Sequence, residues 1–358
     1  MVSSPDLIAF AVALMGSLLL TVPVRRLALH IGMVDLPGPR KVHLSPIPLL
    51  GGIAIYLGFL IAILLTMRGA PRAQMAGILA GATLVAAVGL LDDGKLLHHQ
   101  IKLFAGMPIA AVLLIVSGIR AQIFSEFIPG AGGVALDVAL TLLWVVGITA
   151  SFSIFDHMDG LCAGVAAIAA GFFAVSATLN GQTMVRTLAA AAFGAALGFL
   201  IWNFNPAKIF MGDGGAMLLG FLMATLGLKI RPEGAAHFPA AWLVPVLILG
   251  ATIFDTTLVS ISRSRRGLIP FTTPGTDHAA HRLSNLGLGH RGAVVVLYAL
   301  SGVLGTLALL VPRLSPARAY TLAAALAFAG LIAVALLERA PYERQVRRPS
   351  NPPPAADH

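Results

Sequence analysis

The sequence has little charge and almost no cysteine. Only 11% of its 358 residues are Asp, Glu, Lys or Arg, whereas a soluble domain typically carries about 25%. This shortage excludes an ordinary soluble enzyme. The single cysteine, Cys162, excludes an internal disulfide and a zinc site built from cysteines. Aromatic residues make up 7% of the chain and no basic tract is interleaved with them, so we expect no nucleic-acid partner.

Long apolar runs take the place of the missing charge. The chain is 58% hydrophobic, and about 20 apolar residues form one helix that crosses a bilayer. No segment alternates between polar and apolar residues, so the runs predict helices and not the strands of a barrel. We expect an all-α polytopic membrane bundle with eleven spans, near residues 6–24, 48–67, 74–91, 103–119, 137–155, 161–179, 184–203, 214–230, 239–259, 291–311 and 316–337.

Positive charge is distributed unevenly between the two sides of this bundle. The chain has 24 Lys and Arg residues against 15 Asp and Glu residues, an excess that predicts contact with anionic membrane lipid or phosphate ligands. If the N-terminus lies outside, the inward segments hold twice as many Lys and Arg residues as the outward ones, as cytoplasmic loops do. We therefore expect a cytoplasmic C-terminus. Residues 1–338 then form one transmembrane domain, and the basic, Pro-rich residues 339–358 form a disordered cytoplasmic tail.

Five polar segments fall on the predicted inner side. They are GPRKVHLSP (38–46), GLLDDGK (89–95), FDHMDG (155–160), FNPAKIFMGDGG (204–215) and GTDHAAHRL (275–283). Four of them adjoin the ends of predicted helices, and the fifth lies in a long loop. Because all five share one side, we expect a single site that faces the cytoplasm.

Aspartates give these segments their metal-binding capacity. Asp92 and Asp93 end one predicted helix, Asp156 and Asp159 are spaced i, i+3, and Asp213 opens another helix beside two glycines. Taken singly, each is also explained as a solvated acid or a helix cap. Together they supply the one or two carboxylates that Mg²⁺ uses, and the glycine-flanked helix N-terminus offers backbone N–H groups to phosphate. We expect Mg²⁺, with Mn²⁺ as the alternative.

Histidines and basic residues give the segments their anion-binding capacity. We expect a diphosphate to accept hydrogen bonds from three side chains on one helical face, those of His278, His281 and Arg282. The alternative is a solvated basic loop. Lys41 and His43 add weaker anion-binding capacity. Zinc is the weaker metal candidate, because cysteine ligands are absent and the two loop histidines lie three positions apart.

Asp255 lies inside the apolar run 239–259. An ionised carboxylate at the centre of a spanning helix costs about 2.5–3.5 kcal/mol on insertion scales. We expect this side chain to face a protein cavity near the inner surface, as a site residue or as the partner of a basic group, and not to face lipid.

The five segments, in this order, resemble the polyprenyl-phosphate N-acetylhexosamine-1-phosphate transferase family. The resemblance runs from about Gly32 to Val311, with NPAKIFMGDGG as its most specific match. DLPGPRKVHLSPIPLLGG, GLLDD with Lys102 after it, and DHAAHRL look like the family's other loops. The resemblance implies an enzyme of the bacterial inner membrane that joins a sugar 1-phosphate from a UDP-N-acetylhexosamine, N-acetylglucosamine above all, to polyprenyl phosphate. It leaves a homodimer open.

The resemblance also implies roles for single residues. Asp92 and Asp93 match an acidic pair that handles metal and lipid phosphate, Asp213 matches a Mg²⁺ ligand, and Phe210 matches an aromatic residue on the uracil ring. With the residue chemistry above, we predict catalytic roles for Asp92, Asp93, His278 and His281, metal binding by Asp93 and Asp213, and substrate binding by Lys41, His43, Lys102, Asp156, Asp159, Asn205, Phe210, Asp255 and Arg282.

Three residues depart from the family's third motif. Ala150 and Ser153 stand where the family has asparagine, and His157 stands where Asn or Gly is usual. We expect these changes to remove hydrogen-bonding groups from the site and to alter the choice of sugar donor. Two other functional classes stay open: a non-catalytic membrane protein that binds polyprenyl phosphate or a nucleotide sugar on the same scaffold, and, ranked last, a transporter.

Overall fold

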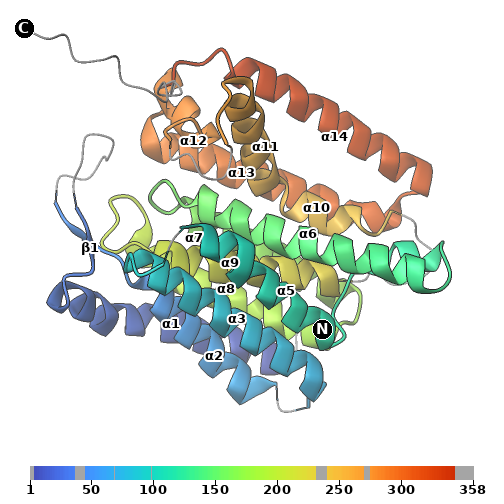
Figure 1. Cartoon of the computed structure of the whole chain (residues 1–358), viewed down its shortest axis with the longest axis horizontal. Coiled ribbons are helices and arrows are strands. Elements are labelled where there is room, and N and C mark those ends of the chain that lie inside the picture. The colour runs from blue at the N-terminus through green and yellow to red at the C-terminus, as the bar shows by residue number, and fades with distance from the viewer. Residues whose placement is uncertain are drawn as a thin grey trace, which may run out of the picture.

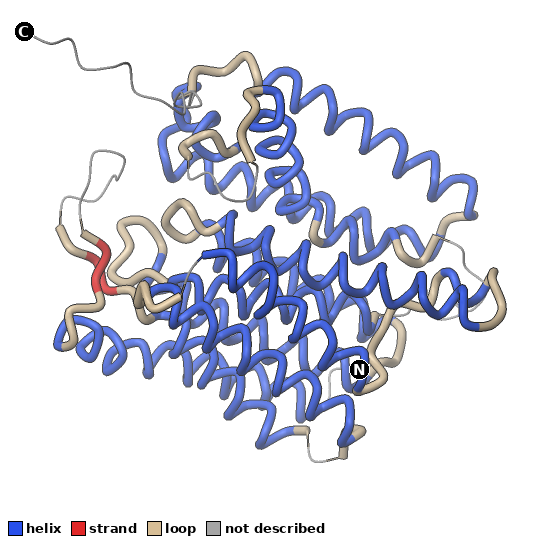
Figure 2. The backbone as a smooth tube through the Cα atoms, in the orientation of Figure 1, coloured by secondary structure: helices blue, strands red, loops and turns tan. Residues whose placement is uncertain are grey.

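Helices make up almost all of the secondary structure (Figure 2) in a computed structural model that describes residues 4–36, 45–67, 69–97, 99–230, 240–269 and 275–342. The α-helices are α1 (Ser4–His30), α2 (Gly51–Thr66), α3 (Arg72–Asp93), α4 (His99–Ile101), α5 (Met107–Val116), α6 (Ala131–Phe155), α7 (Leu161–Leu179), α8 (Thr183–Asn203), α9 (Gly212–Lys229), α10 (Leu243–Ile248), α11 (Gly250–Arg265), α12 (Ala279–Leu283), α13 (Gly289–Leu310) and α14 (Pro316–Leu337). Strands β1 (Val34–Asp35) and β2 (Ile47–Pro48) form one short antiparallel pair. The all-α prediction is confirmed.

The predicted spans coincide with helices, but two of them are interrupted. A π-helical segment, Lys102–Gly106, precedes α5. The run 239–259 is divided at Leu249, where the backbone leaves helical geometry before α11 begins at Gly250. Glycine is a weak helix former, which favours a break at this point. Seven of the described helices are long and apolar enough to cross a membrane, so the chain is a polytopic membrane protein, while the count of eleven crossings stays a prediction.

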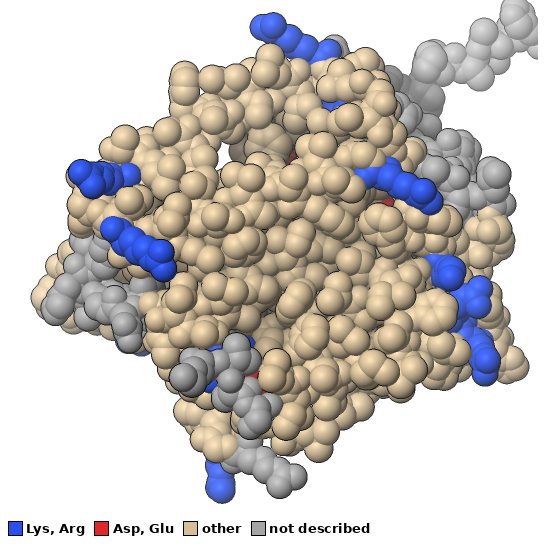
Figure 3. All heavy atoms as spheres, turned by 180° about the vertical axis from the view of Figure 1, so that it is seen from behind, with Lys and Arg blue, Asp and Glu red and all other residues tan. Residues whose placement is uncertain are grey.

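The outer surface is apolar over a broad band. Figure 3 shows one face on which Lys and Arg side chains lie near the margins and the middle carries almost no charge. On α14, Phe328, Leu331 and Leu336 are 67, 58 and 60% exposed. Exposed apolar surface of this extent is unfavourable in water and favourable against lipid. The surface therefore agrees with a bundle set in a bilayer.

Helix α9 lies at the centre of the bundle, with α3 and α6 packed against it. Glycines allow the helices beside its N-terminus to approach closely. A Cβ atom on Gly89 of α3 would lie 2.5 Å from the Cα atom of Gly214, and one on Gly52 of α2 would overlap the backbone nitrogen of Gly215. Only glycine permits backbones to come this near. The N-terminus of α9 is thus held in direct backbone contact with α2 and α3.

Helices α11 to α14 form a second layer, at the top of Figure 1, while α10 packs into the main core. This layer has its own small core, in which Phe155 and Leu161 pack with Leu258, Ala279 and Val294. These contacts connect the end of α6 and the start of α7 with α11, α12 and α13. The layer therefore carries the 275–283 segment to the end of α6, where FDHMDG lies.

Candidate active site

Two aspartates from distant parts of the chain converge on one lysine. Lys102 Nζ lies 2.7 Å from Asp92 Oδ2 and 2.5 Å from Asp213 Oδ2. Asp92 comes from the end of α3, Lys102 from the π-helical segment before α5, and Asp213 from the first turn of α9. The segments predicted to meet here do meet. Their oxygen atoms surround a position that already holds a positive charge.

Asp93 caps helix α9. Its Oδ1 accepts a hydrogen bond from the backbone nitrogen of Asp213 at 2.8 Å, and its Oδ2 accepts one from that of Gly214 at 3.1 Å. A carboxylate in this position satisfies unpaired N–H groups and interacts favourably with the helix dipole. The geometry differs from the expectation that this N-terminus is free for phosphate, because Asp93 takes two of its donors. The reason is the close approach of α3, whose last residue reaches over the helix start.

Ser153 keeps a hydrogen bond that the sequence indicated was lost. On α6, Ser153 Oγ donates to Asp213 Oδ1 at 2.5 Å. The expectation that serine at this position withdraws a hydrogen-bonding group from the site is therefore wrong for Ser153. Ala150, one turn earlier, is 5% exposed and offers no polar side chain.

The FDHMDG and FNPAKIF segments are joined through Asp159. Asp159 Oδ2 accepts hydrogen bonds from Asn205 Nδ2 and from the backbone nitrogen of Ala207, each at 3.0 Å. Arg291 Nε in turn donates to Asn205 Oδ1 at 3.0 Å. Burial, and then the negative charge of Asp213, raise the pKa of Asp156 to about 8. Asp159 and Asn205 therefore hold the loop, while Asp156 lies close enough to Asp213 to be affected by its charge.

Phe210 is fixed by its backbone to the start of α2. Its nitrogen donates to the carbonyl oxygen of Pro48 at 2.8 Å, and its own carbonyl oxygen accepts from the nitrogen of Gly51 at 2.9 Å. Nearby, a mostly apolar cavity of about 180 Å³ lies between α2, α3 and the start of α9; its lining includes Tyr56 and Met211 and reaches Asp93. An apolar space thus opens beside the acidic centre.

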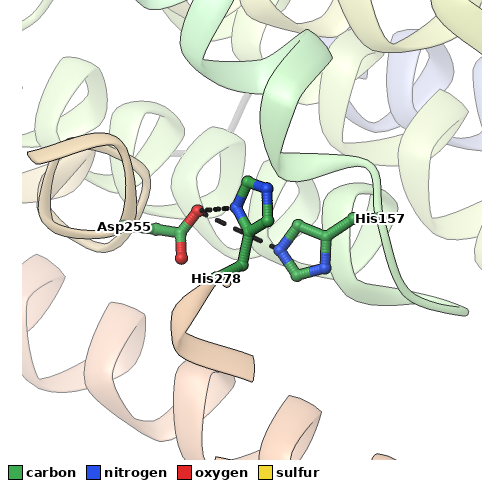
Figure 4. Close-up of side chains that lie close together, drawn as sticks. All are labelled: His157, Asp255 and His278. Atoms are coloured by element: carbon green, nitrogen blue, oxygen red, sulfur yellow. Dashed lines mark hydrogen bonds and ion pairs between the residues drawn. The ribbon is translucent and has the colours of Figure 1, made fainter. Parts of the chain in front are cut away.

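A second centre lies where α11, α12 and the loop after α6 meet (Figure 4). Asp255 has no exposed surface; its Oδ2 lies 2.8 Å from His278 Nδ1, and its Oδ1 accepts from the nitrogen of Ala279 at 2.7 Å. The prediction that Asp255 faces the protein interior beside a basic group is confirmed. His157 lies on the other side of His278, with ring centroids 4.0 Å apart, and also stacks on His281 at 4.6 Å.

Arg282 does not have the position expected of a diphosphate donor. It has no exposed surface. Its Nε donates to the carbonyl oxygen of Asp277 at 2.7 Å, and its terminal nitrogens donate to Ser262 Oγ at 2.9 Å and to Glu338 Oε1 at 2.6 Å. The guanidinium also lies 3.9 Å from the ring centroid of Tyr342. These bonds use its donors to join α12 with α11 and the end of α14, which is a structural role.

An ion-pair cluster that the sequence did not predict lies beside this centre. Arg263 Nε and Nη2 donate to Asp277 at 3.0 and 2.7 Å, and Arg266 donates to the same carboxylate. Burial alone would raise the pKa of Asp277, but the hydrogen bonds and charge of the two arginines outweigh it and hold that pKa at about 2. The available signal was the i, i+3 spacing of the two arginines at the end of α11. This cluster anchors the backbone just before His278.

The two centres meet at the end of α6. Ser153 reaches Asp213, and His157, one turn further along, reaches the Asp255 centre. Four of the five predicted segments are thus brought together. Lys41 and His43, from the remaining segment, lie outside the described residues.

Sequence comparisons relate this chain to known transferases. Residues 75–231 match the family model described as glycosyl transferase family 4. The chain is 36% identical to the "Probable undecaprenyl-phosphate N-acetylglucosaminyl 1-phosphate transferase" of Bacillus subtilis, covering 81% of this chain and 80% of the relative. It is 33% identical to the decaprenyl-phosphate N-acetylglucosaminephosphotransferase of Mycobacterium tuberculosis, covering 79% of this chain and 76% of the relative. It is also 27% identical to the undecaprenyl-phosphate alpha-N-acetylglucosaminyl 1-phosphate transferase of Escherichia coli O157:H7, covering 80 and 78%.

Proposed function

The chain belongs to the polyprenyl-phosphate N-acetylhexosamine-1-phosphate transferase family, and we propose that it transfers N-acetylglucosamine 1-phosphate from UDP-N-acetylglucosamine to polyprenyl phosphate. UMP leaves, and polyprenyl-diphosphate-N-acetylglucosamine is the product, a precursor for cell-envelope glycans. The observation that carries the proposal within the fold is the convergence of Asp92 and Asp213 on Lys102 at the start of α9.

The reaction needs a means of reducing the repulsion between its two anionic substrates more than it needs a strong base. The second pKa of a phosphate monoester is about 6, so polyprenyl phosphate is mostly a dianion at neutral pH. Its oxygen attacks the β-phosphorus of the donor, the bond from that phosphorus to the bridging oxygen breaks, and UMP departs with the electron pair. The difficulty is to bring a dianion against a diphosphate. Lys102 supplies one fixed positive charge at the place where the two anions approach, which suits a reaction catalysed mainly by positioning and electrostatics.

The acidic centre fits Mg²⁺. Lys102 lies between the carboxylates of Asp92 and Asp213, so its ammonium group would shift when the two carboxylates share an ion. Their all-oxygen donor set suits Mg²⁺, or Mn²⁺ in its place. Asp92 and Asp213 would hold the ion, which when bound neutralises charge on the donor's diphosphate. Asp93 is engaged with the backbone of α9, so its role is to position Asp213 and not to lead as a ligand. Ser153 orients the second oxygen of Asp213.

The remaining substrate contacts follow from the placement of the loops. The ring of Phe210 would pack on uracil, with Asp159 and Asn205 holding the loop that presents it. His278 and His281 would lie on the diphosphate side. The apolar cavity that reaches Asp93 is a place for the first isoprenoid units.

The membrane arrangement is part of the same proposal. Eleven spans, an outside N-terminus and a cytoplasmic C-terminus would direct the site toward the cytoplasm of a bacterial inner membrane, where UDP-sugars are made. Residues 1–338 would form the single transferase domain, and a homodimer stays a prediction.

The test is release of uridine nucleotide by the purified protein from a panel of UDP-sugars, with and without polyprenyl phosphate and Mg²⁺. We expect UMP, fastest from UDP-N-acetylglucosamine, and only when the lipid phosphate and the metal ion are both present. Asp213→Asn should abolish the release while the protein stays folded. Release of UDP instead of UMP, or no lipid-dependent release from any donor, would contradict the proposal and favour a non-catalytic binding protein or a transporter.

A further inference from the structure

His157 is a largely enclosed histidine whose two ring nitrogens are buried and have no hydrogen-bond partner among the described residues. Its side chain is only 11% exposed. A buried polar group in this state costs free energy unless a ligand satisfies it. A neutral imidazole carries a lone pair on one of its ring nitrogens, and that nitrogen can bind a metal ion.

Asp255 and His278 complete a set of three ligand atoms around the same space. One atom from each of His157, Asp255 and His278 lies within 4.8 Å of the other two. From Asp255 Oδ2 the distances are 2.8 Å to His278 Nδ1 and 4.0 Å to His157 Nε2 (Figure 4). Ligand bonds of about 2.0–2.1 Å in a tetrahedral site place ligand atoms about 3.3 Å apart. One observed distance is shorter and the other longer, so small side-chain rotations would bring the three atoms around an ion.

The surroundings hold these ligands in place. The backbone nitrogen of Ala279 donates to Asp255 Oδ1 and leaves Oδ2 for the shared space. Hydrogen bonds of this kind orient ligand carboxylates in metal sites. Arg263 lies 3.5 Å from His278 Nε2 and would repel a cation, but its charge is opposed by the carboxylate of Asp277, which it grips with two hydrogen bonds. Arg266 is paired with the same carboxylate.

The donor set selects the class of ion. Two imidazoles and one carboxylate suit divalent transition metals, whereas Mg²⁺ prefers oxygen ligands throughout. Three protein ligands also leave one tetrahedral position open for water or an anionic oxygen. We propose that His157, Asp255 and His278 form a second divalent-metal site that binds an ion of the zinc class and is separate from the carboxylate site at Asp92 and Asp213.

The site would connect three separate elements: the loop after α6, helix α11 and the start of α12. An ion held there would stabilise the folded protein, because binding to the folded state alone adds to its stability. Neither the metal binding nor its effect on stability depends on the transferase reaction. Both can therefore be measured whether or not the proposed function is correct.

The test uses the full chain in detergent, purified without a polyhistidine tag and freed of metal by a chelator. We would titrate it with Co²⁺ in the presence of excess Mg²⁺, which competes for the carboxylate site, and follow the visible absorption of bound Co²⁺. We expect one bound Co²⁺ that Zn²⁺ displaces, and a higher thermal midpoint when Zn²⁺ is added. Absence of bound Co²⁺ would overturn the proposal.

Three variants assign the bound ion. His157→Asn removes one ligand and should weaken Co²⁺ binding at least about ten-fold. Loss of a residue that only hydrogen-bonds to a ligand already lowers metal affinity by about that factor. His30→Asn on the distant α1 is the matched histidine control, and Asp213→Asn reports on the other centre; both should bind as the native chain does. Unchanged binding in His157→Asn, or loss only in Asp213→Asn, would refute the site.

A measurement on the native chain covers the case in which His157→Asn fails to fold. X-ray absorption at the zinc edge detects scattering from imidazole rings bound to the ion. We expect two histidine ligands and an otherwise oxygen-containing shell. A zinc shell without histidine would overturn the proposal.

Discussion

The aspartates of the acidic centre have different roles: Asp213 is placed to bind an ion, and Asp93 positions the start of α9. Both carboxylate oxygens of Asp93 accept hydrogen bonds from the backbone of α9. One oxygen of Asp213 accepts a hydrogen bond from Lys102, and the other accepts one from Ser153. The sequence predicted that these aspartates meet. It did not predict their different roles, because these roles depend on which atoms face each other across helices that are distant in the chain.

Ser153 offers a test of positioning at this scale. Ser153→Ala removes the hydrogen bond to Asp213, and a bond to a charged group contributes about 1.5–3 kcal/mol. We expect turnover to fall about ten-fold or more with every UDP-sugar alike, measured as UMP release. Ser151→Ala, on the same helix and 5% exposed, is the control and should change little. A changed ratio between donors in Ser153→Ala, with full speed on one of them, would show that Ser153 selects the donor instead.

The partners of Arg282 could not be predicted from its motif. This residue lies in a motif predicted to bind diphosphate, yet its guanidinium bonds to the carbonyl oxygen of Leu337 and to Glu338, 55 and 56 positions along the chain. A sequence motif does not reveal such partners, because they come from a helix outside the motif.

The structural role of Arg282 leads to a stability prediction. Removal of one partner from a buried ion pair typically costs about 3–5 kcal/mol. Arg282→Met should therefore lower the thermal midpoint clearly, whereas Arg265→Met should not, since Arg265 is 70% exposed and lies 3.9 Å from the same Glu338. Thermal unfolding in detergent compares the two. Equal midpoints together with a raised KM for the UDP-sugar in Arg282→Met would restore the substrate-binding role.

At the scale of elements, hydropathy predicted where the helices lie, and for some of them the exact bounds, but it did not predict interruptions. The predicted runs 161–179 and 316–337 match α7 and α14 in full, because apolar sequence of spanning length stops at polar or turn residues. The division between α10 and α11 and the π-helical start of α5 were missed. Hydropathy is continuous through both, so it carries no sign of a local change in backbone geometry.

The contact between α3 and α9 is the element-scale feature on which the acidic centre depends. Gly89→Ala places a methyl group 2.5 Å from the Cα atom of Gly214, and a backbone atom there cannot rotate away as a side chain does. The two helices must separate, which would move Asp92 and Asp93 relative to Asp213. We expect UMP release to fall at least about ten-fold, since small displacements in an active site are costly. Gly147→Ala, where the added methyl group meets nothing within 4 Å, should retain activity.

At the scale of the whole molecule, orientation in the membrane is the main untested prediction. In a chain with Cys162 replaced, we would introduce Leu286→Cys on the predicted cytoplasmic side and Ser315→Cys on the predicted outer side; both positions are exposed. A membrane-impermeant maleimide should label Ser315→Cys on intact cells, and Leu286→Cys only after the cells are opened. The reverse pattern would overturn the topology and the cytoplasmic site.

The whole bundle brings segments from residues 89 to 283 together around the end of α6. We propose that the site formed there transfers a phosphate together with the sugar. The most direct measurement supplies UDP-N-acetylglucosamine labelled with ³²P at its β-phosphate, together with polyprenyl phosphate and Mg²⁺, and follows the label. We predict that the label enters the lipid as the second phosphate of a polyprenyl diphosphate, with unlabelled UMP left in solution. Label that stays in a water-soluble nucleotide while the lipid gains sugar, or that never reaches the lipid, would contradict this prediction.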